Sequence, residues 1–243
     1  MKCDIVIRSY YKDFEWLSYC LASIARHAGG FRRVILVVPQ KSLARLDYLG
    51  IEADEIHVSE NHRDDYLGQQ ITKLTADLHT DADSICHLDS DCAFHGSLSP
   101  HDLMDGGKPV MVMTPYRLLP RQNPWKGITQ DFLGWPVGFD FMRRMPVLYP
   151  RWIYGELRRF ASERHGVSLE SYVLSRPHRG FSEFNALGGF AFERHRESFS
   201  WVDSSREPVR ELPCKVFWSW GGIDDRTRRE LLDCVGEHRA RRA

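Results

Sequence analysis

Short apolar runs alternate with amphipathic stretches along the first half of the chain. The apolar runs have the length of strands and end at polar or proline residues. The stretches between them carry apolar residues at helical spacing, as in Phe14, Leu17, Leu21 and Ile24, with Asp13 placed to cap. We therefore predict strands over 3–7, 33–38, 55–58, 85–89 and 109–114, and helices from 14 to the glycines at 29 and 30, over 42–49, and from a cap at Asp64 or Asp65 through Leu78.

Strands that alternate with helices at this spacing predict an α/β fold with an open, mainly parallel sheet flanked by helices. Beyond Tyr116 the alternation stops, and prolines and tryptophans interrupt the chain. We treat residues 1–243 as a single domain with a regular half, 1–116, and an irregular half, 117–243. In the second half we predict a helix over 151–164, an element of undecided type over 183–192, a strand over 215–218 and a terminal helix opened by Gly221 and Gly222.

The composition is that of an ordinary globular protein, with 42% hydrophobic and 27% charged residues. The longest aliphatic run, Val34–Val38, is far shorter than the roughly 20 residues of a membrane-spanning helix. The N-terminus lacks the charged-then-apolar pattern of a signal peptide. These features predict a cytoplasmic protein with no membrane span.

Neither the cysteines nor the net charge points to a binding class. The six cysteines include no Cys-x-x-Cys pair, and a zinc site at Cys86, His87 and Cys92 is disfavoured because neighbouring strand residues point to opposite faces. The net charge is zero, but residues 1–116 carry 11 Lys and Arg against 17 Asp and Glu, and the remainder carries 22 against 16. An acidic half suits a cation and a basic half suits an anion, although the two halves can also simply face each other.

The strand over 85–89 ends in the sequence Asp89-Ser90-Asp91, which is the main candidate for chemistry. The carboxyl edge of a parallel sheet is where ligands bind, and paired carboxylates suit Mg²⁺ or Mn²⁺ that also contacts substrate phosphates. The alternative is a polar turn, since Asp and Ser are common turn residues.

Several stretches together resemble GT-A type glycosyltransferases. The resemblance rests on residues 7–17, 66–74, 87–91, 182–184 and 218–220. More closely, the chain is similar to a family of small bacterial and phage GT-A-like proteins of formerly unknown function. The resemblance implies a GT-A-like fold, with a nucleotide-sugar half over 1–116 and a half over 117–243 that holds the acceptor and a C-terminal closing segment. It also implies a metal-dependent transfer from a nucleotide-diphosphate sugar to a hydroxyl acceptor.

The resemblance assigns the divalent ion, Mn²⁺ or Mg²⁺, to Asp89 and Asp91, with Asp89 contacting either ribose or metal. Many GT-A enzymes supply a late histidine as a third metal ligand, but residues 218–225 contain none, which leaves Asp224 or water. Tyr10 and Tyr11 can stack on a base or pack in the core, and Lys73 can neutralise phosphate charge or remain a solvated helix lysine. The implied nucleotide-sugar-binding residues are Arg8, Ser9, Tyr10, Tyr11, Asp13, Gln70, Lys73, Asp89, Gly221 and Gly222.

Glu183 is the predicted catalytic residue, because an inverting transfer needs a carboxylate base near the acceptor hydroxyl. A surface carboxylate is the alternative. The acceptor is expected to meet Trp125 and Trp220, whose rings suit a glycan or lipid-linked acceptor. A hydroxymethylated base in DNA is the second choice, on the basis of Arg121, Arg143, Arg144, Arg158, Arg159 and Arg179.

Two readings from other classes remain open. A nucleotidyl or phosphoryl transferase would use the same paired aspartates, but it usually adds a glycine-rich loop after the first strand, and residues 8–12 contain no glycine. A non-catalytic nucleotide-sugar-binding domain would bind the donor without turnover. The sequence does not identify the sugar, the acceptor or the stereochemical outcome.

Overall fold

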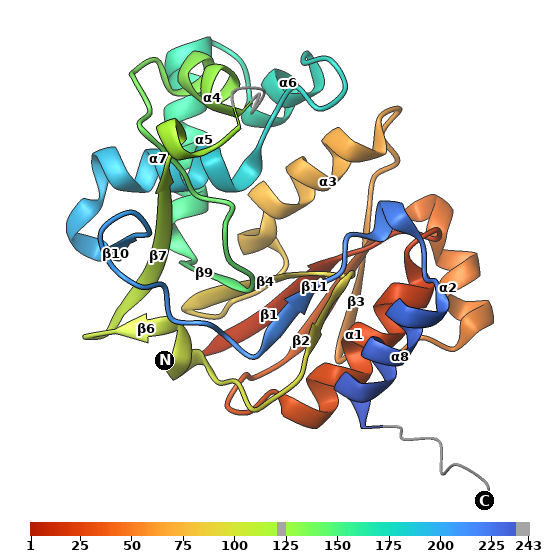
Figure 1. The fold of residues 1–243 in the computed structure, drawn as a ribbon. Helices are drawn as coiled ribbons and strands as arrows, with labels where there is room; N and C mark the ends of the chain where they lie inside the picture. Colours follow the sequence, from red (N-terminus) through yellow and green to blue (C-terminus); the bar gives the residue numbers. More distant parts are fainter. Residues whose placement is uncertain (121–124, 237–243) are drawn as a thin grey trace, which may run out of the picture.

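The computed structural model describes residues 1–120 and 125–236. Its central sheet contains β1 (Cys3–Arg8), β2 (Val34–Pro39), β3 (Glu55–Ser59), β4 (Ser84–Asp89) and β9 (Val147–Pro150). The strand order is β3-β2-β1-β4-β9, as Figure 1 shows. The four strands from the first half run parallel, and β9 runs antiparallel to β4. The predicted α/β class with a mainly parallel sheet is confirmed.

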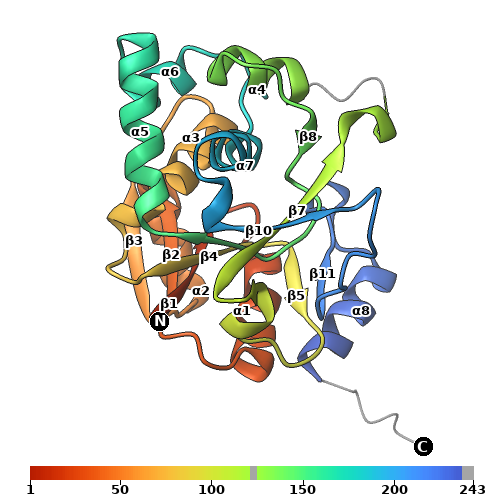
Figure 2. The same ribbon diagram turned by 90° about the vertical axis from the view of Figure 1, so that its left-hand side faces the viewer.

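Helices cover both faces of this sheet (Figures 1 and 2). On one face lie α1 (Phe14–His27) and α2 (Leu43–Leu49); on the other lie α3 (Asp65–Leu74), α5 (Trp152–His165), α6 (Leu169–Leu174) and α7 (Glu183–Arg194). Because strand side chains alternate between faces, β1 contributes to two hydrophobic cores. Val6 packs with α3, α5 and α7, whereas Ile5 and Ile7 pack with α1 and α2. The sheet is thereby buried on both sides.

The remaining elements extend these layers. Helix α4 (Trp125–Leu133) contacts α7, and α8 (Asp225–Val235) packs on α1. A second sheet joins β10 (Ser200–Asp203), β7 (Lys108–Pro115) and β6 (Met104–Asp105), with β8 (Phe139–Asp140) paired to β7. A two-stranded ribbon joins β5 (Cys92–Phe94) and β11 (Cys214–Val216) antiparallel. Single 3-10 turns lie at Gln40–Ser42, Ala76–Leu78, Pro100–Leu103, Tyr116–Leu118, Arg196–Ser198 and Ser219–Gly221.

Several predicted elements need correction. Leu78 is 68% exposed, because α3 ends at Leu74 and the chain continues as a 3-10 turn that carries Leu78 off the apolar stripe. The terminal helix begins at Asp225 and not at the glycine pair, since Asp224 caps it by accepting the Thr227 N–H. The strand predicted over 109–114 is present as β7, but it lies in the second sheet. The undecided element over 183–192 is the helix α7.

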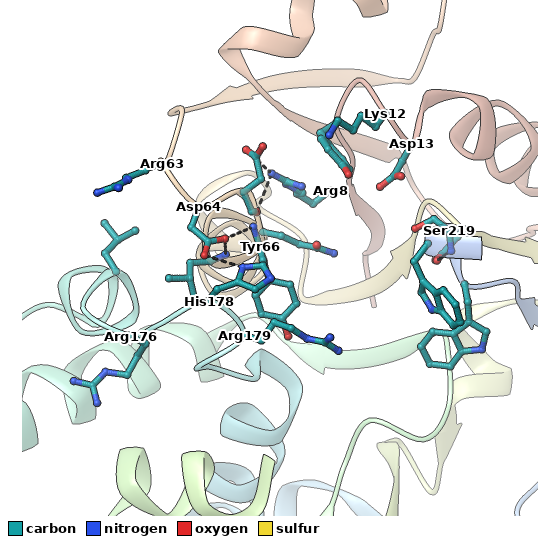
Figure 3. Close-up of a pocket in the computed structure, with 18 residues that line it drawn as sticks. Arg8, Lys12, Asp13, Arg63, Asp64, Tyr66, Arg176, His178, Arg179 and Ser219 are labelled. Carbon is teal, nitrogen blue, oxygen red and sulfur yellow. Dashed lines mark hydrogen bonds and ion pairs between the residues drawn. The ribbon is translucent and has the colours of Figure 1, made fainter. Parts of the chain in front are cut away.

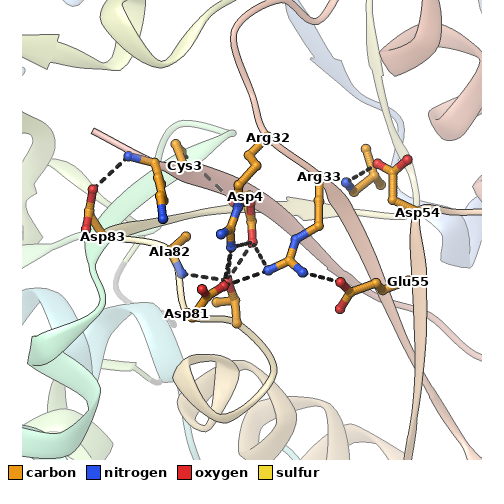
Figure 4. Close-up of polar contacts among 12 residues, drawn as sticks. Cys3, Asp4, Arg32, Arg33, Asp54, Glu55, Asp81, Ala82 and Asp83 are labelled. Carbon is orange, nitrogen blue, oxygen red and sulfur yellow. Dashed lines mark hydrogen bonds and ion pairs between the residues drawn. The ribbon is translucent and has the colours of Figure 1, made fainter.

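A polar network lies at the amino end of β1 (Figure 4). Asp4 is fully buried and accepts two hydrogen bonds from Arg32, at 2.8 and 2.7 Å, and one from Arg33 at 3.1 Å. Thr80 donates its hydroxyl to the same carboxylate, and Asp81 pairs with both arginines. Burial alone would raise the pKa of Asp4, but these hydrogen bonds outweigh it and lower that pKa. Every oxygen of this buried charge is thus satisfied.

Within residues 1–120 and 125–236, no helix combines the length and hydrophobicity needed to cross a lipid bilayer.

Candidate functional site

A cleft of about 1370 Å³ opens at the carboxyl end of the parallel strands. Its walls come from the end of β1, the loop that leads into α1, the start of α3, the loop between α6 and α7, and the segment after β11. Figure 3 shows Asp13 and Ser219 on one side of this cleft, Arg63 and Arg176 on the other, and Arg8 between them. Open α/β sheets bind ligands at this end.

One side of the cleft carries the carboxylates of Asp13 and Asp91. Burial raises the pKa of Asp13 to about 6, and the charges of Asp91 and Asp89 act in the same direction. Burial and the charge of Asp89 also raise the pKa of Asp91, although the Ser219 N–H donates to Asp91 Oδ2 at 2.7 Å. The prediction that Asp13 caps α1 is wrong for its side chain, which makes no capping hydrogen bond. Three carboxylates therefore repel one another at one edge of the sheet.

Arg8 is a buried cation without a close counter-ion. Only 5% of the residue is exposed, and its guanidinium lies 4.0 Å from the Asp65 carboxylate, which itself pairs with Lys41 at 2.6 Å. Its Nε has no hydrogen-bond partner within the described residues. Burial lowers the pKa of Arg8, against the opposing charges of Asp65 and Asp13. Buried charges are normally paired, so this guanidinium is suited to an anionic ligand.

A buried ion-pair chain lies beside the carboxylates. Lys73 Nζ is 2.6 Å from Asp89 Oδ1 and 2.8 Å from Glu183 Oε1. Burial opposes the charge on Lys73, but Asp89 and Glu183 outweigh it and raise the lysine pKa. Gln70 accepts the Glu183 backbone N–H at 2.8 Å and so fixes the start of α7 against α3. The solvated-lysine alternative for Lys73 and the surface alternative for Glu183 are both wrong, since these residues are 3% and 1% exposed.

The opposite wall of the cleft is basic. Arg63 and Arg179 make no hydrogen bond or ion pair within the described part of the chain, and Arg176 contacts only the Ser175 hydroxyl and the Tyr172 ring. Both acidic residues on this wall have partners: Asp64 binds His178 at 2.9 Å and two N–H groups of its own helix, and Asp65 pairs with Lys41 at 2.6 Å. The wall therefore carries excess positive charge.

Two residues with unusual backbone conformations face this cleft. Among residues 1–120 and 125–236, only Arg179 and Trp218 are non-glycine residues with positive φ, at 60° and 62°. Both line the cleft. This left-handed region costs free energy for side chains other than glycine, and such conformations cluster at functional sites.

The structure brings some predicted site residues together at the cleft and not others. The cleft is lined by Arg8, Tyr10, Asp13, Asp91 and Trp220, of which Trp220 is 87% exposed. Ser9, Gln70, Lys73, Asp89 and Glu183 are not on the cleft wall but lie at or behind the strand ends. Tyr11, Gly221, Gly222 and Trp125 are also outside it.

The contacts of the residues outside the cleft limit what they can do. The N–H groups of Gly221 and Gly222 donate to the carbonyls of Trp218 and Ser219. The Tyr11 N–H donates to Ser42 Oγ. Asp224, considered as a third metal ligand, caps α8 and does not line the cleft. Of the six arginines considered for DNA, only Arg179 lines the cleft, while Arg121 lies outside the described residues.

Sequence reasoning did not single out several residues on the cleft wall, among them Arg63, Tyr66, Arg176, His178 and Trp218. Arg63 and Arg176 stand in loops, and nothing in the local pattern shows that these loops meet. The strand predicted over 215–218 is wrong at its end: β11 ends at Val216, and Trp218 leads into the turn that the glycines at 221 and 222 signal.

The carboxylate oxygens at the cleft are of the type that binds a hard divalent ion. Asp13 and Asp91 offer carboxylate oxygens whose mutual repulsion a cation would relieve, and Asp89 keeps one oxygen away from Lys73. Among the described residues, no group of three or more His, Cys, Asp or Glu side chains is gathered closely enough to hold a metal without rearrangement. Compared with known proteins, the chain matches no protein-family model and no curated protein.

Proposed function

We propose that this protein is a glycosyltransferase that uses a nucleotide-diphosphate sugar. The proposal rests on one observation: carboxylates that lack a cation and an arginine that lacks a close anion lie at the same edge of the sheet. The crowded carboxylates of Asp13 and Asp91 favour a cation, and the buried Arg8, whose one ion pair is long at 4.0 Å and whose Nε has no partner within the described residues, favours an anion. A diphosphate bound together with a divalent ion satisfies both, which supports a GT-A-like donor site.

In this proposal Asp91, Asp13 and the free oxygen of Asp89 hold the metal, and Arg8 binds the diphosphate. When bound, Mn²⁺ or Mg²⁺ supplies a Lewis acid that stabilises the leaving diphosphate as the bond between sugar and phosphate oxygen breaks. Tyr10 and the tryptophans at 218 and 220 provide rings at the cleft for the base or the sugar. The volume of about 1370 Å³ leaves room for both a donor and an acceptor.

Lys73 and Glu183 take supporting roles in this scheme. Lys73 orients Asp89 by an ion pair at 2.6 Å, and Glu183 holds Lys73 from the other side. Glu183 was predicted as the base that accepts the proton of the acceptor hydroxyl. Its side chain is buried and does not line the cleft, so the arrangement favours a positioning role through Lys73. As a base it would need α7 or the loop before it to move.

The acceptor in this proposal is a saccharide or lipid-linked glycan. Most of the arginines considered for DNA are already engaged: Arg143 pairs with Asp140, Arg158 with Asp77 and Arg159 with Glu156, while Arg144 donates to a backbone carbonyl. A duplex binder needs several cations free to meet phosphates along one face. Modified DNA therefore stays second.

The test is product analysis with a panel of nucleotide sugars, with Mn²⁺ or with EDTA. We expect metal-dependent release of nucleoside diphosphate, and we expect Asp91→Asn to lower the rate about 100-fold or more, since a metal site depends on each ligand. Asp47→Asn, at an exposed position of α2, is the matched control and should match the unmodified protein. Thermal unfolding verifies that the variants are folded.

The products separate the competing functions. Release of nucleoside monophosphate and sugar phosphate would identify transfer or hydrolysis at the phosphate and overturn the proposal. A donor that raises the melting temperature without any turnover would instead identify a non-catalytic binding domain.

A further inference from the structure

The basic wall of the cleft has a construction that the donor site does not require. Its three arginines come from two segments far apart in the sequence, Arg63 before α3 and Arg176 and Arg179 after α6. Figure 3 shows Arg63 and Arg176 on the far side of Arg8 from Asp13 and Ser219. Arg63 and Arg176 therefore lie apart from the carboxylates proposed to hold the metal.

The acidic groups near this wall already have partners. Asp64 accepts from His178 at 2.9 Å, and Asp65 pairs with Lys41 at 2.6 Å. Within residues 1–120 and 125–236 neither Arg63 nor Arg179 has a carboxylate partner, and Arg176 rests on the Tyr172 ring at 4.6 Å. The wall consequently presents guanidinium groups whose charge is unpaired.

The backbone at Arg179 has an unfavourable conformation for an arginine. Residues 177–180 form a tight turn in which the Gly180 N–H donates to the Pro177 carbonyl at 2.7 Å. Arg179 occupies this turn at φ 60°, a conformation that glycine or asparagine adopts with less strain. An arginine at this position costs stability, and nothing in its contacts within the described residues offsets that cost.

We propose that Arg63, Arg176 and Arg179 bind an anionic group on the saccharide acceptor, a carboxylate or a phosphate. This inference rests on the proposed function, because it places the acceptor in the half of the cleft opposite the metal. The planar guanidinium presents paired N–H groups that match the two oxygens of either anion. A neutral saccharide would leave these charges unmet. The acceptor class is thus an acidic glycan, such as one that contains uronic acid or sugar phosphate.

The test measures direct binding, so it does not depend on turnover. Calorimetry compares trigalacturonate, galactose 6-phosphate and neutral galactotriose at low and high salt. We expect the carboxylate or the phosphate ligand to bind at least about tenfold more tightly than the neutral one and to weaken as salt rises. Whichever of the two anions binds better identifies the source of the charge.

Arg179→Gly separates a binding role from a structural one. We expect it to weaken anionic binding roughly tenfold while leaving the melting temperature unchanged or higher, because glycine relieves the left-handed backbone. Arg176→Gln should weaken binding similarly, and Arg45→Gln, an exposed arginine of α2, should not. Equal binding of neutral and acidic saccharides, or unaltered binding by both cleft variants, would overturn the inference.

The two proposals fail in different ways. Nucleoside diphosphate release without preference for acidic saccharides leaves the glycosyltransferase proposal standing and removes this one. Once a donor is known, acidic saccharides should also raise nucleotide release above the rate of donor hydrolysis, and stimulation by neutral saccharides alone would count against the inference.

Discussion

The two ends of strand β1 carry buried charges of opposite sign and very different surroundings. At the amino end Asp4 is fully buried, and Arg32, Arg33 and Thr80 satisfy its carboxylate. At the carboxyl end Arg8 is 5% exposed, its nearest carboxylate oxygen is 4.0 Å away, and its Nε has no partner among the described residues. The buried charge at the amino end of β1 therefore has all its partners, whereas the buried charge at the carboxyl end, which faces the cleft, does not.

This difference separates groups that hold the fold from groups prepared for a ligand. A satisfied buried charge stabilises only while its partners remain, so the removal of one member is costly. An unsatisfied buried charge already lowers stability, and its removal costs little in the free protein. Removing the charge should therefore lower the free energy of unfolding strongly at Asp4 and only slightly at Arg8.

The largest expected effect is on stability at the amino end. Asp4→Ala removes the buried carboxylate that Arg32 and Arg33 share and leaves them only the exposed Asp81 in common. We expect a loss of about 3 kcal/mol in the free energy of unfolding, the lower end of the range for broken buried pairs, since both arginines keep some contact with water. Urea unfolding measures it, and Asp47→Ala on the surface of α2 is the control. A loss below about 1 kcal/mol would mean that the network contributes little.

The next effect is on binding at the carboxyl end. Arg8→Gln should change the free energy of unfolding by less than about 1 kcal/mol, because the charge it removes has no close partner. Binding of inorganic pyrophosphate with Mg²⁺, followed by calorimetry, should weaken roughly 10- to 100-fold. Arg45→Gln serves as the control. A strongly destabilised variant with intact pyrophosphate affinity would reverse the contrast between the two strand ends.

The smallest effect concerns pH. Burial raises the pKa of Asp13 to about 6, so the folded protein binds this proton more tightly than the unfolded chain, where the pKa is 3.8. The contribution of Asp13 to stability is therefore fully present below pH 4 and is lost as the pH rises through 6. In EDTA, the unmodified protein should lose about 1 kcal/mol relative to Asp13→Asn between pH 4 and pH 7, after allowance for solvent screening. Parallel stability curves for the two proteins would contradict this expectation.

The central strands could be predicted because their information is local. Strands β1, β2 and β4 are mainly apolar runs between helices with apolar stripes, β3 alternates apolar and polar residues, and Asp64 caps α3 as one of the two predicted candidates. Strand β9 could not be predicted in the same way. It has four residues, follows Pro146 and exists because it pairs with β4 across a long sequence separation.

The same division applies to the candidate site. Arg8, Asp13 and Asp91 follow directly from the ends of predicted strands, which parallel pairing brings to one edge. Lys73 lies off the apolar stripe of α3, and its burial depends on carboxylates from β4 and α7. The arginines at 63, 176 and 179 come from loops, whose meeting is a property of the whole fold.

The hydrogen bond from the Ser219 N–H to Asp91 Oδ2 connects Asp91 to two exposed tryptophans. Ser219 stands between Trp218 and Trp220, which are 64% and 87% exposed. A cation that binds this carboxylate oxygen competes with the Ser219 N–H and so moves the segment that carries both tryptophans. Indole emission depends on the surroundings of the ring. We therefore expect the intrinsic fluorescence of Trp218 and Trp220 to change when Asp91 binds a cation.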